Sequence, residues 1–213
     1  MNTKNNCLWI GIGTVINDNN EIYSELIKVN SYLVKEMSGG LAYSGTLRPH
    51  LNFYDLSVHS DNINYIDKSL SDTLKNQKPI ECEILGIKFF KFGIIYVEIK
   101  KNKQLVELHQ KILESVSPHK GDCIDPDYQK LTPKLSEEQN KSLNKFGNPY
   151  MSEFKPHITL GYLPNKLKEL EGLISKIESM LLIKKFTLNR VDLVKGKDSK
   201  ETEVVAEYKF LNK

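Results

Sequence analysis

The most informative part of the sequence is Lys155-Pro156-His157-Ile158-Thr159-Leu160, because the chain contains a near-copy of it upstream, Arg48-Pro49-His50-Leu51-Asn52-Phe53. Both stretches follow one pattern: a basic residue, proline, histidine, an apolar residue, a polar residue and a second apolar residue. Alternate side chains of a β-strand share a face, so each stretch predicts a cation, an imidazole and a hydrogen-bonding side chain on one face. The apolar side chains then point the other way, into a core. Two such strands facing each other would form a two-histidine site for a phosphate.

Hydrophobic patterns place the two stretches at equivalent points of a repeated unit. Apolar runs and alternations predict strands, and apolar residues spaced three and four apart predict helices. The expected strands are 7–16, 49–58, 82–90, 94–100, 156–163, 186–194 and 202–211, and the expected helices are 21–37, 62–76, 103–116 and 166–182. The order is therefore β-α-β-α-β and then β-α-β-α-β-β, with a histidine strand at the same place in each half.

The second half carries an insertion. His50 and His157 are 107 residues apart (157 − 50), whereas the strands that open the two halves are about 87 residues apart (94 − 7). The missing ~20 residues fall in 117–150, which contains four prolines and shows no clean period. Long connections in compact domains are usually lids or binding loops, and Ser136-Glu137-Glu138-Gln139 has the form of a helix capping box. We therefore expect a lid that carries a short helix.

Composition favours one globular domain over residues 1–213. The chain is 39% hydrophobic and 27% charged, which excludes a disordered chain, and its net charge of +3 does not identify a nucleic-acid binder. The apolar run 8–16 is too short to span a membrane. Cys7, Cys82 and Cys123 are odd in number and have no CxxC spacing, which predicts free thiols in a reducing compartment and no structural zinc site. We expect a cytoplasmic, monomeric protein that does not bind membranes.

Two histidines on one surface can carry acid–base chemistry at phosphorus. The unperturbed pKa of histidine lies near neutrality, so one imidazole can accept a proton while another donates one. In-line displacement needs both tasks, because a base takes the proton of the attacking water or hydroxyl and an acid protonates the departing oxygen. Donors two residues along, together with Arg48 or Lys155, can hold the non-bridging oxygens. Which of His50 and His157 is the acid stays open at this point.

The paired His-x-Thr-type strands in a duplicated arrangement resemble the 2H phosphoesterase superfamily, which includes LigT-like RNA 2′,3′-cyclic phosphodiesterases, once called 2′-5′ RNA ligases. The resemblance covers about residues 7–211, and 156–160 and 186–194 carry it best. It implies an α/β (α+β) fold with two lobes, about 7–90 and 94–211, whose mostly antiparallel sheets face a central cleft with the helices outside. It also implies a metal-independent hydrolase, without a cofactor, that cleaves or ligates phosphodiester bonds of nucleotides, cyclic oligonucleotides or RNA ends.

Carried over residue by residue, the resemblance makes His50 and His157 catalytic, and Asn52 and Thr159 phosphate-binding. The chain departs from the family at Asn52, where Thr or Ser is usual. An Asn amide can donate to a phosphate oxygen, but it is longer than a hydroxyl and does not rotate as freely. Asn52 is therefore the position at which the resemblance gives least support to a phosphate-binding role.

Aromatic residues close to the two motifs could stack on a nucleobase. The candidates are Tyr54, Tyr150 and Phe154. The sequence places Trp9 and Tyr96 in the core, and His59, His109 and His119 on the surface or on a helix face.

Three hypotheses follow from these residues. The first is a metal-independent phosphodiesterase that hydrolyses 2′,3′-cyclic or 2′-5′/3′-5′ linkages. The second, motivated by Asn52, is a nucleotide- or RNA-end-binding module that has lost catalysis and sequesters its ligand. The third is a metal site built on His50, His157 and a carboxylate such as Asp55, although these histidines lack the close spacing of zinc ligands on a helix.

Overall fold

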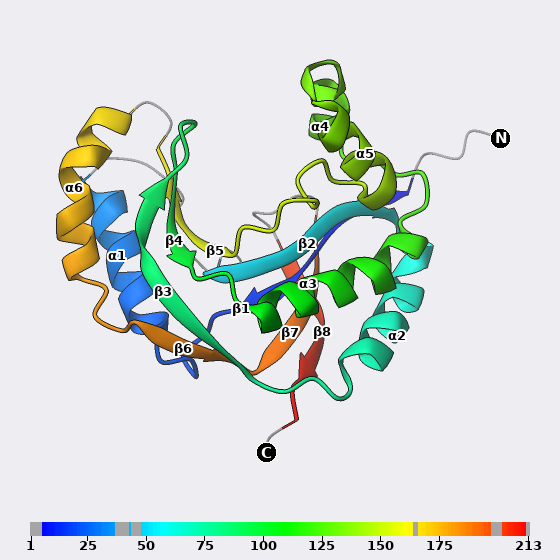
Figure 1. Cartoon of the computed structure of the whole chain (residues 1–213), viewed down its shortest axis with the longest axis horizontal. Helices are drawn as coiled ribbons and strands as arrows, with labels where there is room; N and C mark the ends of the chain where they lie inside the picture. Colours follow the sequence, from blue (N-terminus) through cyan, green and yellow to red (C-terminus); the bar gives the residue numbers. More distant parts are fainter. Residues whose placement is uncertain (1–5, 37–42, 44–47, 164–165, 197–201, 212–213) are drawn as a thin grey trace.

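The computed structural model describes residues 6–36, 43, 48–163, 166–196 and 202–211 (Figure 1). Its strands are β1 (Cys7–Val15), β2 (His50–His59), β3 (Ile80–Phe89), β4 (Ile94–Ile99), β5 (His157–Tyr162), β6 (Lys185–Leu188), β7 (Arg190–Gly196) and β8 (Thr202–Lys209). Its α-helices are α1 (Tyr23–Glu36), α2 (Ile63–Leu74), α3 (Lys103–Val116), α4 (Pro126–Leu131), α5 (Glu137–Phe146) and α6 (Leu167–Ser179). Short 3₁₀ turns lie at Ser60–Asn62, Ser117–His119 and Thr132–Lys134.

The strands form one curled sheet in the order β6-β3-β4-β5-β2-β1-β7-β8, and every neighbouring pair is antiparallel. The predicted antiparallel α+β fold is therefore confirmed. The strand order interleaves the two halves of the chain, because β3 pairs with β4 and β6, while β7 and β8 join β1 and β2. The single strand predicted over 186–194 is wrong. The chain breaks at Asn189, where it leaves β6 beside β3 and starts β7 beside β1.

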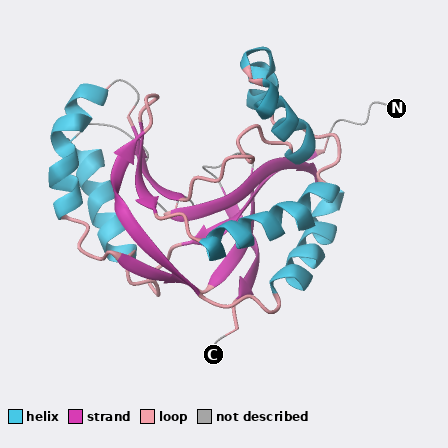
Figure 2. Cartoon of the chain, viewed as in Figure 1, coloured by secondary structure: helices cyan, strands magenta, loops and turns pink. Residues whose placement is uncertain are grey.

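The long helices cover the convex side of the sheet (Figure 2). Helices α1 and α6 pack on β5 and β3, and α3 and α2 pack on β2 and β8. Apolar residues at helical spacing on these helices, such as Leu26 on α1 and Leu108 on α3, are fully or almost fully buried against the sheet. Strands β2 and β5 thus lie in the middle of the sheet, with helices behind them. None of the described helices is both long and apolar enough to cross a membrane.

The predicted insertion contains more structure than the sequence indicated. Both α4 and α5 belong to it, and they stand above the C-terminal end of β2 (Figure 1). The predicted capping box is confirmed, because the Ser136 side chain accepts from the Gln139 N–H and the Gln139 side chain accepts from the Ser136 N–H. Gly147, with φ +73°, ends α5. The insertion is thus a folded helical unit.

The prediction of three free cysteines is wrong for two of them. Cys7 and Cys123 form a disulfide, whereas Cys82 is free and buried. The two partners are separated by 116 residues in sequence, and only the fold brings the first residue of β1 beside the loop that precedes α4. The cysteine pattern therefore gives no support to the inference of a reducing compartment.

Candidate active site

The two predicted histidine strands pair directly with each other. Strand β2 runs antiparallel to β5, with Leu51 opposite Ile158. This register sets His50 opposite Thr159 and Asn52 opposite His157. Opposite residues of an antiparallel pair share a face, and the diagonal pair His50 and His157 is then roughly 7–8 Å apart between Cα atoms. These four half-buried residues define what we call the histidine face of the sheet.

The residues between them point into the core on the other side. Leu51, Phe53, Ile158 and Leu160 are fully or almost fully buried in the cluster that the helices cover. The histidine face is thus the concave side of the sheet, away from the helices (Figure 1). The alternation of side chains predicted from the two motifs is confirmed at these positions.

Both imidazoles are held in the same way. The Nδ1 atom of His50 lies 2.9 Å from the carbonyl oxygen of Arg48, and that of His157 lies 2.7 Å from the carbonyl oxygen of Lys155. A carbonyl oxygen only accepts, so each Nδ1 carries a proton and donates it. In the neutral imidazole this leaves Nε2 unprotonated. Each ring therefore has its Nε2 available to accept a proton.

The surroundings of His157 are aromatic. The Tyr96 ring meets the His157 ring edge-on at 5.3 Å between centroids, and Phe90 does so at 5.8 Å. Burial lowers the pKa of His157 below its ordinary value, the hydrogen bond to Lys155 opposes this shift, and the charge of His50 lowers the pKa further. Burial and the second imidazole thus both favour a neutral His157.

Each histidine strand contains a β-bulge three residues after its histidine. Opposite β1, the register shifts between Ile12 and Gly13, which leaves Phe53 as the extra residue of β2. Opposite β4, the register shifts between Ile95 and Tyr96, and Leu160 is the extra residue of β5. A Cβ atom at Gly13 would lie 2.5 Å from the carbonyl oxygen of Leu51, so this close approach requires glycine.

The carbonyl groups of the two bulged residues receive side chains from the helices behind them. His109 of α3 places Nδ1 2.9 Å from the Phe53 carbonyl oxygen, and Asn30 of α1 donates to the Leu160 carbonyl oxygen at 2.6 Å. Bulged residues leave the ladder and need other partners for their backbone groups. His109 is only 4% exposed, so the placement of this residue on a helix face is correct but its face is the inner one.

The polar residue of β2 belongs to a network with the insertion. The Asn52 amide donates to Asp55 Oδ1 at 2.7 Å, and the Tyr128 hydroxyl donates to Asp55 Oδ2 at 3.2 Å. Asn148 donates to the Asp55 carbonyl oxygen at 3.0 Å. Burial raises the pKa of Asp55, and the hydrogen bonds from Asn52 and Tyr128 oppose this shift. One of the two amide protons of Asn52 is thus fixed, and the other remains for a ligand.

The polar residue of β5 is held through its backbone. The Tyr43 hydroxyl donates to the Thr159 carbonyl oxygen, and the Tyr43 N–H donates to Asn30 Oδ1 at 2.8 Å. Thr159 therefore sits in a fixed backbone. Its side-chain hydroxyl has the rotational freedom that the Asn52 amide lacks.

Two of the three predicted stacking residues are core residues. Tyr54 is fully buried and its hydroxyl donates to the Phe146 carbonyl oxygen, so the prediction that Tyr54 stacks on a base is wrong. The bulge at Phe53 is the reason, because it breaks the alternation that placed Tyr54 beside Asn52. Phe154 is 8% exposed and stacks on His109 at 4.2 Å between centroids, so its prediction is wrong as well.

Tyr150 is the predicted aromatic residue that is accessible. Its side chain is 48% exposed, and it meets the Tyr128 ring edge-on at 6.1 Å between centroids. It therefore lies beside the network of Asp55. The two predicted cations, Arg48 and Lys155, are both exposed, and Lys155 forms an exposed ion pair with Glu153 at 3.0 Å.

An aromatic group that the sequence did not indicate lies next to His157. We call this group, which consists of Phe90, Phe92 and Tyr96, the aromatic platform. Phe90 stacks on Phe92 at 5.2 Å and on Tyr96 at 4.4 Å between centroids. Phe92 is 58% exposed, whereas Tyr96, which was expected in the core, is only half-buried. Strand pairing places the group there, because β4 pairs with β5 and sets Tyr96 opposite Thr159, and the sequence alone does not show this pairing.

The third hypothesis, a metal site on the two histidines, has no support in the geometry. Among the residues that the structure describes, His50, His157 and Asp55 do not form a group whose ligand atoms lie within 4.8 Å of one another. Asp55 is instead occupied by Asn52 and Tyr128.

The model of the 2′-5′ RNA ligase superfamily matches residues 34–200, which is most of the chain and includes both histidine strands. The chain belongs to this superfamily of 2H phosphoesterases. No curated protein matches the sequence.

Solved structures of TT0787 and of LigT share the fold at low sequence identity. TT0787 of Thermus thermophilus has a TM-score of 0.64 and 11% identity, with 95% of this chain and 97% of that chain covered. LigT of E. coli in its apo form has a TM-score of 0.61 and 10% identity, with 97% and 99% covered. LigT in complex with 3′-AMP has a TM-score of 0.56, again at 10% identity, with 97% and 99% covered.

Proposed function

We propose that this 2H phosphoesterase is a metal-independent phosphodiesterase that hydrolyses 2′,3′-cyclic or 2′-5′ linkages of nucleotides, cyclic oligonucleotides or RNA ends. The pairing of Leu51 with Ile158 carries the proposal, because this register brings His50 and His157 to one face. Superfamily membership supports chemistry at a phosphate ester. Every group comes from one chain, so a monomer is sufficient.

His157 is the general base of the proposed reaction. Its lowered pKa keeps the ring neutral near pH 7, and the hydrogen bond from Nδ1 to Lys155 leaves Nε2 as the acceptor. When the pair of imidazoles shares one proton, burial of His157 favours the state with that proton on His50. His157 then takes a proton from the attacking water, and His50 gives its proton to the departing oxygen.

Asn52 and Thr159 stand beside the two histidines and hold the non-bridging oxygens. One amide proton of Asn52 is free of Asp55, and the Thr159 hydroxyl rotates toward its acceptor. Hydrogen bonds to a charged phosphate contribute about 1.5–3 kcal/mol each. Arg48 and Lys155 offset the charge from the exposed ends of the two strands.

The aromatic platform supports a substrate with a nucleobase. Phe92 exposes its ring while Phe90 holds it from behind, and the group ends at His157. Stacking of a base on an aromatic ring is worth about 1–3 kcal/mol and tolerates different bases. Tyr150 offers a second ring on the side of the insertion. A substrate with two nucleosides around one phosphate would use both.

A panel of nucleoside 2′,3′-cyclic phosphates, 2′-5′ and 3′-5′ dinucleotides and cyclic dinucleotides, assayed in EDTA, tests the proposal. We expect turnover of at least one compound with a 2′-oxygen at the phosphorus, and the same rate with and without EDTA. The Leu182→Ala variant, which changes an exposed side chain between α6 and β6 and leaves the histidine face intact, is the control for the histidine variants. Turnover that requires a divalent metal, or that survives in His50→Ala, would refute the mechanism.

A second candidate function is capture of the nucleotide without cleavage. Asn52 favours it, because its amide replaces the hydroxyl usual in the family and is partly occupied by Asp55. Calorimetry followed by chromatography of the ligand separates the two functions. A binding module returns the ligand intact after saturation, and any cleaved product decides for the enzyme.

A further inference from the structure

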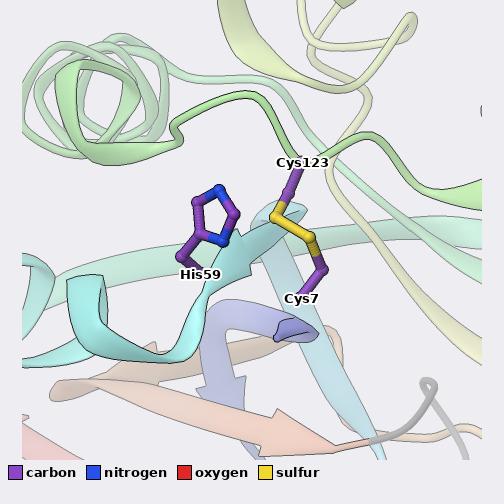
Figure 3. Close-up of side chains that lie close together, drawn as sticks. All are labelled: Cys7, His59 and Cys123. Atoms are coloured by element: carbon purple, nitrogen blue, oxygen red, sulfur yellow. A yellow bond between two sulfur atoms is a disulfide. The ribbon is translucent and has the colours of Figure 1, made fainter. Parts of the chain in front are cut away.

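A second cluster of reactive side chains lies at the other end of β2, where the insertion meets the sheet. Among the described residues, Cys7, His59 and Cys123 place one ligand atom each within 4.8 Å of one another (Figure 3). The two sulfur atoms are joined in the disulfide, and the His59 ring lies beside them (Figure 3). The proposed phosphodiesterase chemistry uses none of these residues.

Two of the three residues form a cross-strand pair. Cys7 is the first residue of β1 and His59 the last of β2, and the ladder sets them directly opposite each other. Their side chains therefore share a face, with Cβ atoms roughly 4.5–5.5 Å apart. Cys123 comes from the loop before α4, and its Cα atom is 6.0 Å from that of Cys7. The cluster thus combines two fixed strand ends with one loop.

The loop that carries Cys123 is shaped to the His59 ring. Gly121 has φ +67°, and a Cβ atom there would lie 3.0 Å from His59 Cδ2. Asn62 anchors the same loop by donating to the His119 carbonyl oxygen at 2.8 Å. A side chain at position 121 would thus press on the imidazole. The close approach of loop and ring depends on glycine.

Asp122 engages one nitrogen of His59 and leaves the other to the sulfur atoms. His59 Nε2 lies 2.5 Å from Asp122 Oδ1. Histidines that bind metals almost always donate their second ring N–H to a carboxylate or carbonyl, which fixes the tautomer and orients the ring. With Nε2 protonated and held by Asp122, Nδ1 is the atom that can bind a metal.

We propose that Cys7, Cys123 and His59 form a Zn²⁺ site when the disulfide is reduced, with Asp122 as the residue that orients His59. Two thiolates and one imidazole are ligands that zinc prefers, and a water completes the tetrahedron. At Zn–S distances of about 2.3 Å, tetrahedral geometry needs the sulfur atoms roughly 3.8 Å apart. Rotation of the two cysteine side chains provides this separation once the S–S bond is broken.

Reduction and metal binding are separate, balanced steps. With a phosphine reductant, the S–S bond takes two electrons from phosphorus. One water molecule supplies both thiol protons, and its oxygen leaves on the phosphine as the phosphine oxide. Zn²⁺ then displaces the two thiol protons. The disulfide and the metal site are alternative links between the base of the insertion and the ends of β1 and β2.

Titration of the phosphine-reduced full chain with Co²⁺, a spectroscopic substitute for Zn²⁺, tests the site. We expect about one Co²⁺ per chain, a thiolate-to-cobalt charge-transfer absorption, and loss of that absorption when Zn²⁺ is added. The oxidised chain should show no such band. Cys82→Ala should keep the band, because Cys82 is buried away from the cluster.

Variants give a graded result. Cys7→Ser and Cys123→Ser should abolish the charge-transfer band, and Asp122→Asn should weaken metal affinity about 10–100-fold while keeping the band. Asp122 is 91% exposed, so this variant folds even where a cysteine variant does not. A reduced wild-type chain without the band, a band that persists in Cys7→Ser, or unchanged affinity in Asp122→Asn would overturn the proposal.

Discussion

Strands β2 and β5 have the same local backbone structure, and they differ mainly in the side chains that surround the site on each strand. Both begin at a histidine whose Nδ1 contacts a carbonyl two residues upstream, and both bulge three residues later. Around His157 the neighbours are the rings of Phe90 and Tyr96. On the β2 side, the charge of His50 acts on Asp55, which is hydrogen-bonded to Asn52 and to Tyr128 of the insertion. In the proposed mechanism, these unequal surroundings are the reason that His157 acts as the base and His50 as the acid.

The largest expected effect comes from removing either histidine. His50→Ala and His157→Ala should each lower kcat by roughly 10²–10⁴, because each loses one proton transfer. Steady-state kinetics on the best substrate of the panel measures the loss. The double variant should lose little more than either single variant, since the two transfers belong to one reaction. A single variant that keeps wild-type kcat would contradict the assignment of one proton transfer to each histidine.

The buried side chains behind the two bulges should matter equally for stability. His109→Ala leaves the Phe53 carbonyl without its partner, and Asn30→Ala does the same to the Leu160 carbonyl. An unsatisfied buried acceptor costs about 1–3 kcal/mol of unfolding free energy. Urea denaturation measures both, with the exposed Tyr162→Ala variant as control. A loss in only one of the two would show that the bulges are not equivalent.

Within the part of the chain that the structure describes, the network on the β2 side has no counterpart on β5, so its disruption should affect only one half of the site. Asp55→Ala removes the acceptor of Asn52 and Tyr128, and it should lower kcat/KM about tenfold. Asp55→Asn keeps one acceptor oxygen and should lose less. Tyr162→Ala changes the equivalent position of β5 and should leave kcat/KM unchanged. A larger loss of kcat/KM in Tyr162→Ala than in Asp55→Ala would contradict the role of Asp55 in positioning Asn52.

The smallest expected effect is a shift of the pH profile. Because burial lowers the pKa of His157, the acid limb of kcat/KM should lie below the ordinary histidine value of about 6.5. Tyr96→Ala exposes the ring and should move this limb up toward that value. The same lowered pKa also makes the free energy of unfolding fall as the pH falls. Between the lowered folded pKa and the ordinary value the unfolded state binds more protons, so stability is lost as the pH falls through this window. If the acid limb of Tyr96→Ala stays in place or moves to lower pH, burial by Tyr96 is not what lowers the pKa of His157.

The sequence predicted the elements well where local periodicity decides them. The stripe of apolar residues over 103–116 gave α3 with its observed bounds, and the two motifs gave β2, β5 and the inward direction of Leu51 and Ile158. These features depend on neighbours in sequence. Helix spacing and strand alternation are read from the chain itself.

The features that the sequence analysis predicted wrongly or not at all depend on contacts between segments that are distant in sequence. The bulge at Phe53 follows from pairing with Gly13, so alternation alone placed Tyr54 on the wrong face. The break at Asn189 arises because the chain changes partner strands there. The link between Cys7 and Cys123 also requires the fold. The aromatic platform was missed for the same reason, since strand order sets it beside His157.

Nitrogen NMR of the two imidazoles tests most directly that His50 and His157 flank one phosphorus. In the free protein, both rings should show a protonated Nδ1 when neutral, as their contacts to Arg48 and Lys155 require. Titration with a nucleoside monophosphate product should shift both Nε2 resonances along one binding curve with one Kd. Shifts confined to one ring, or two curves with different Kd values, would show that the histidines do not share a site.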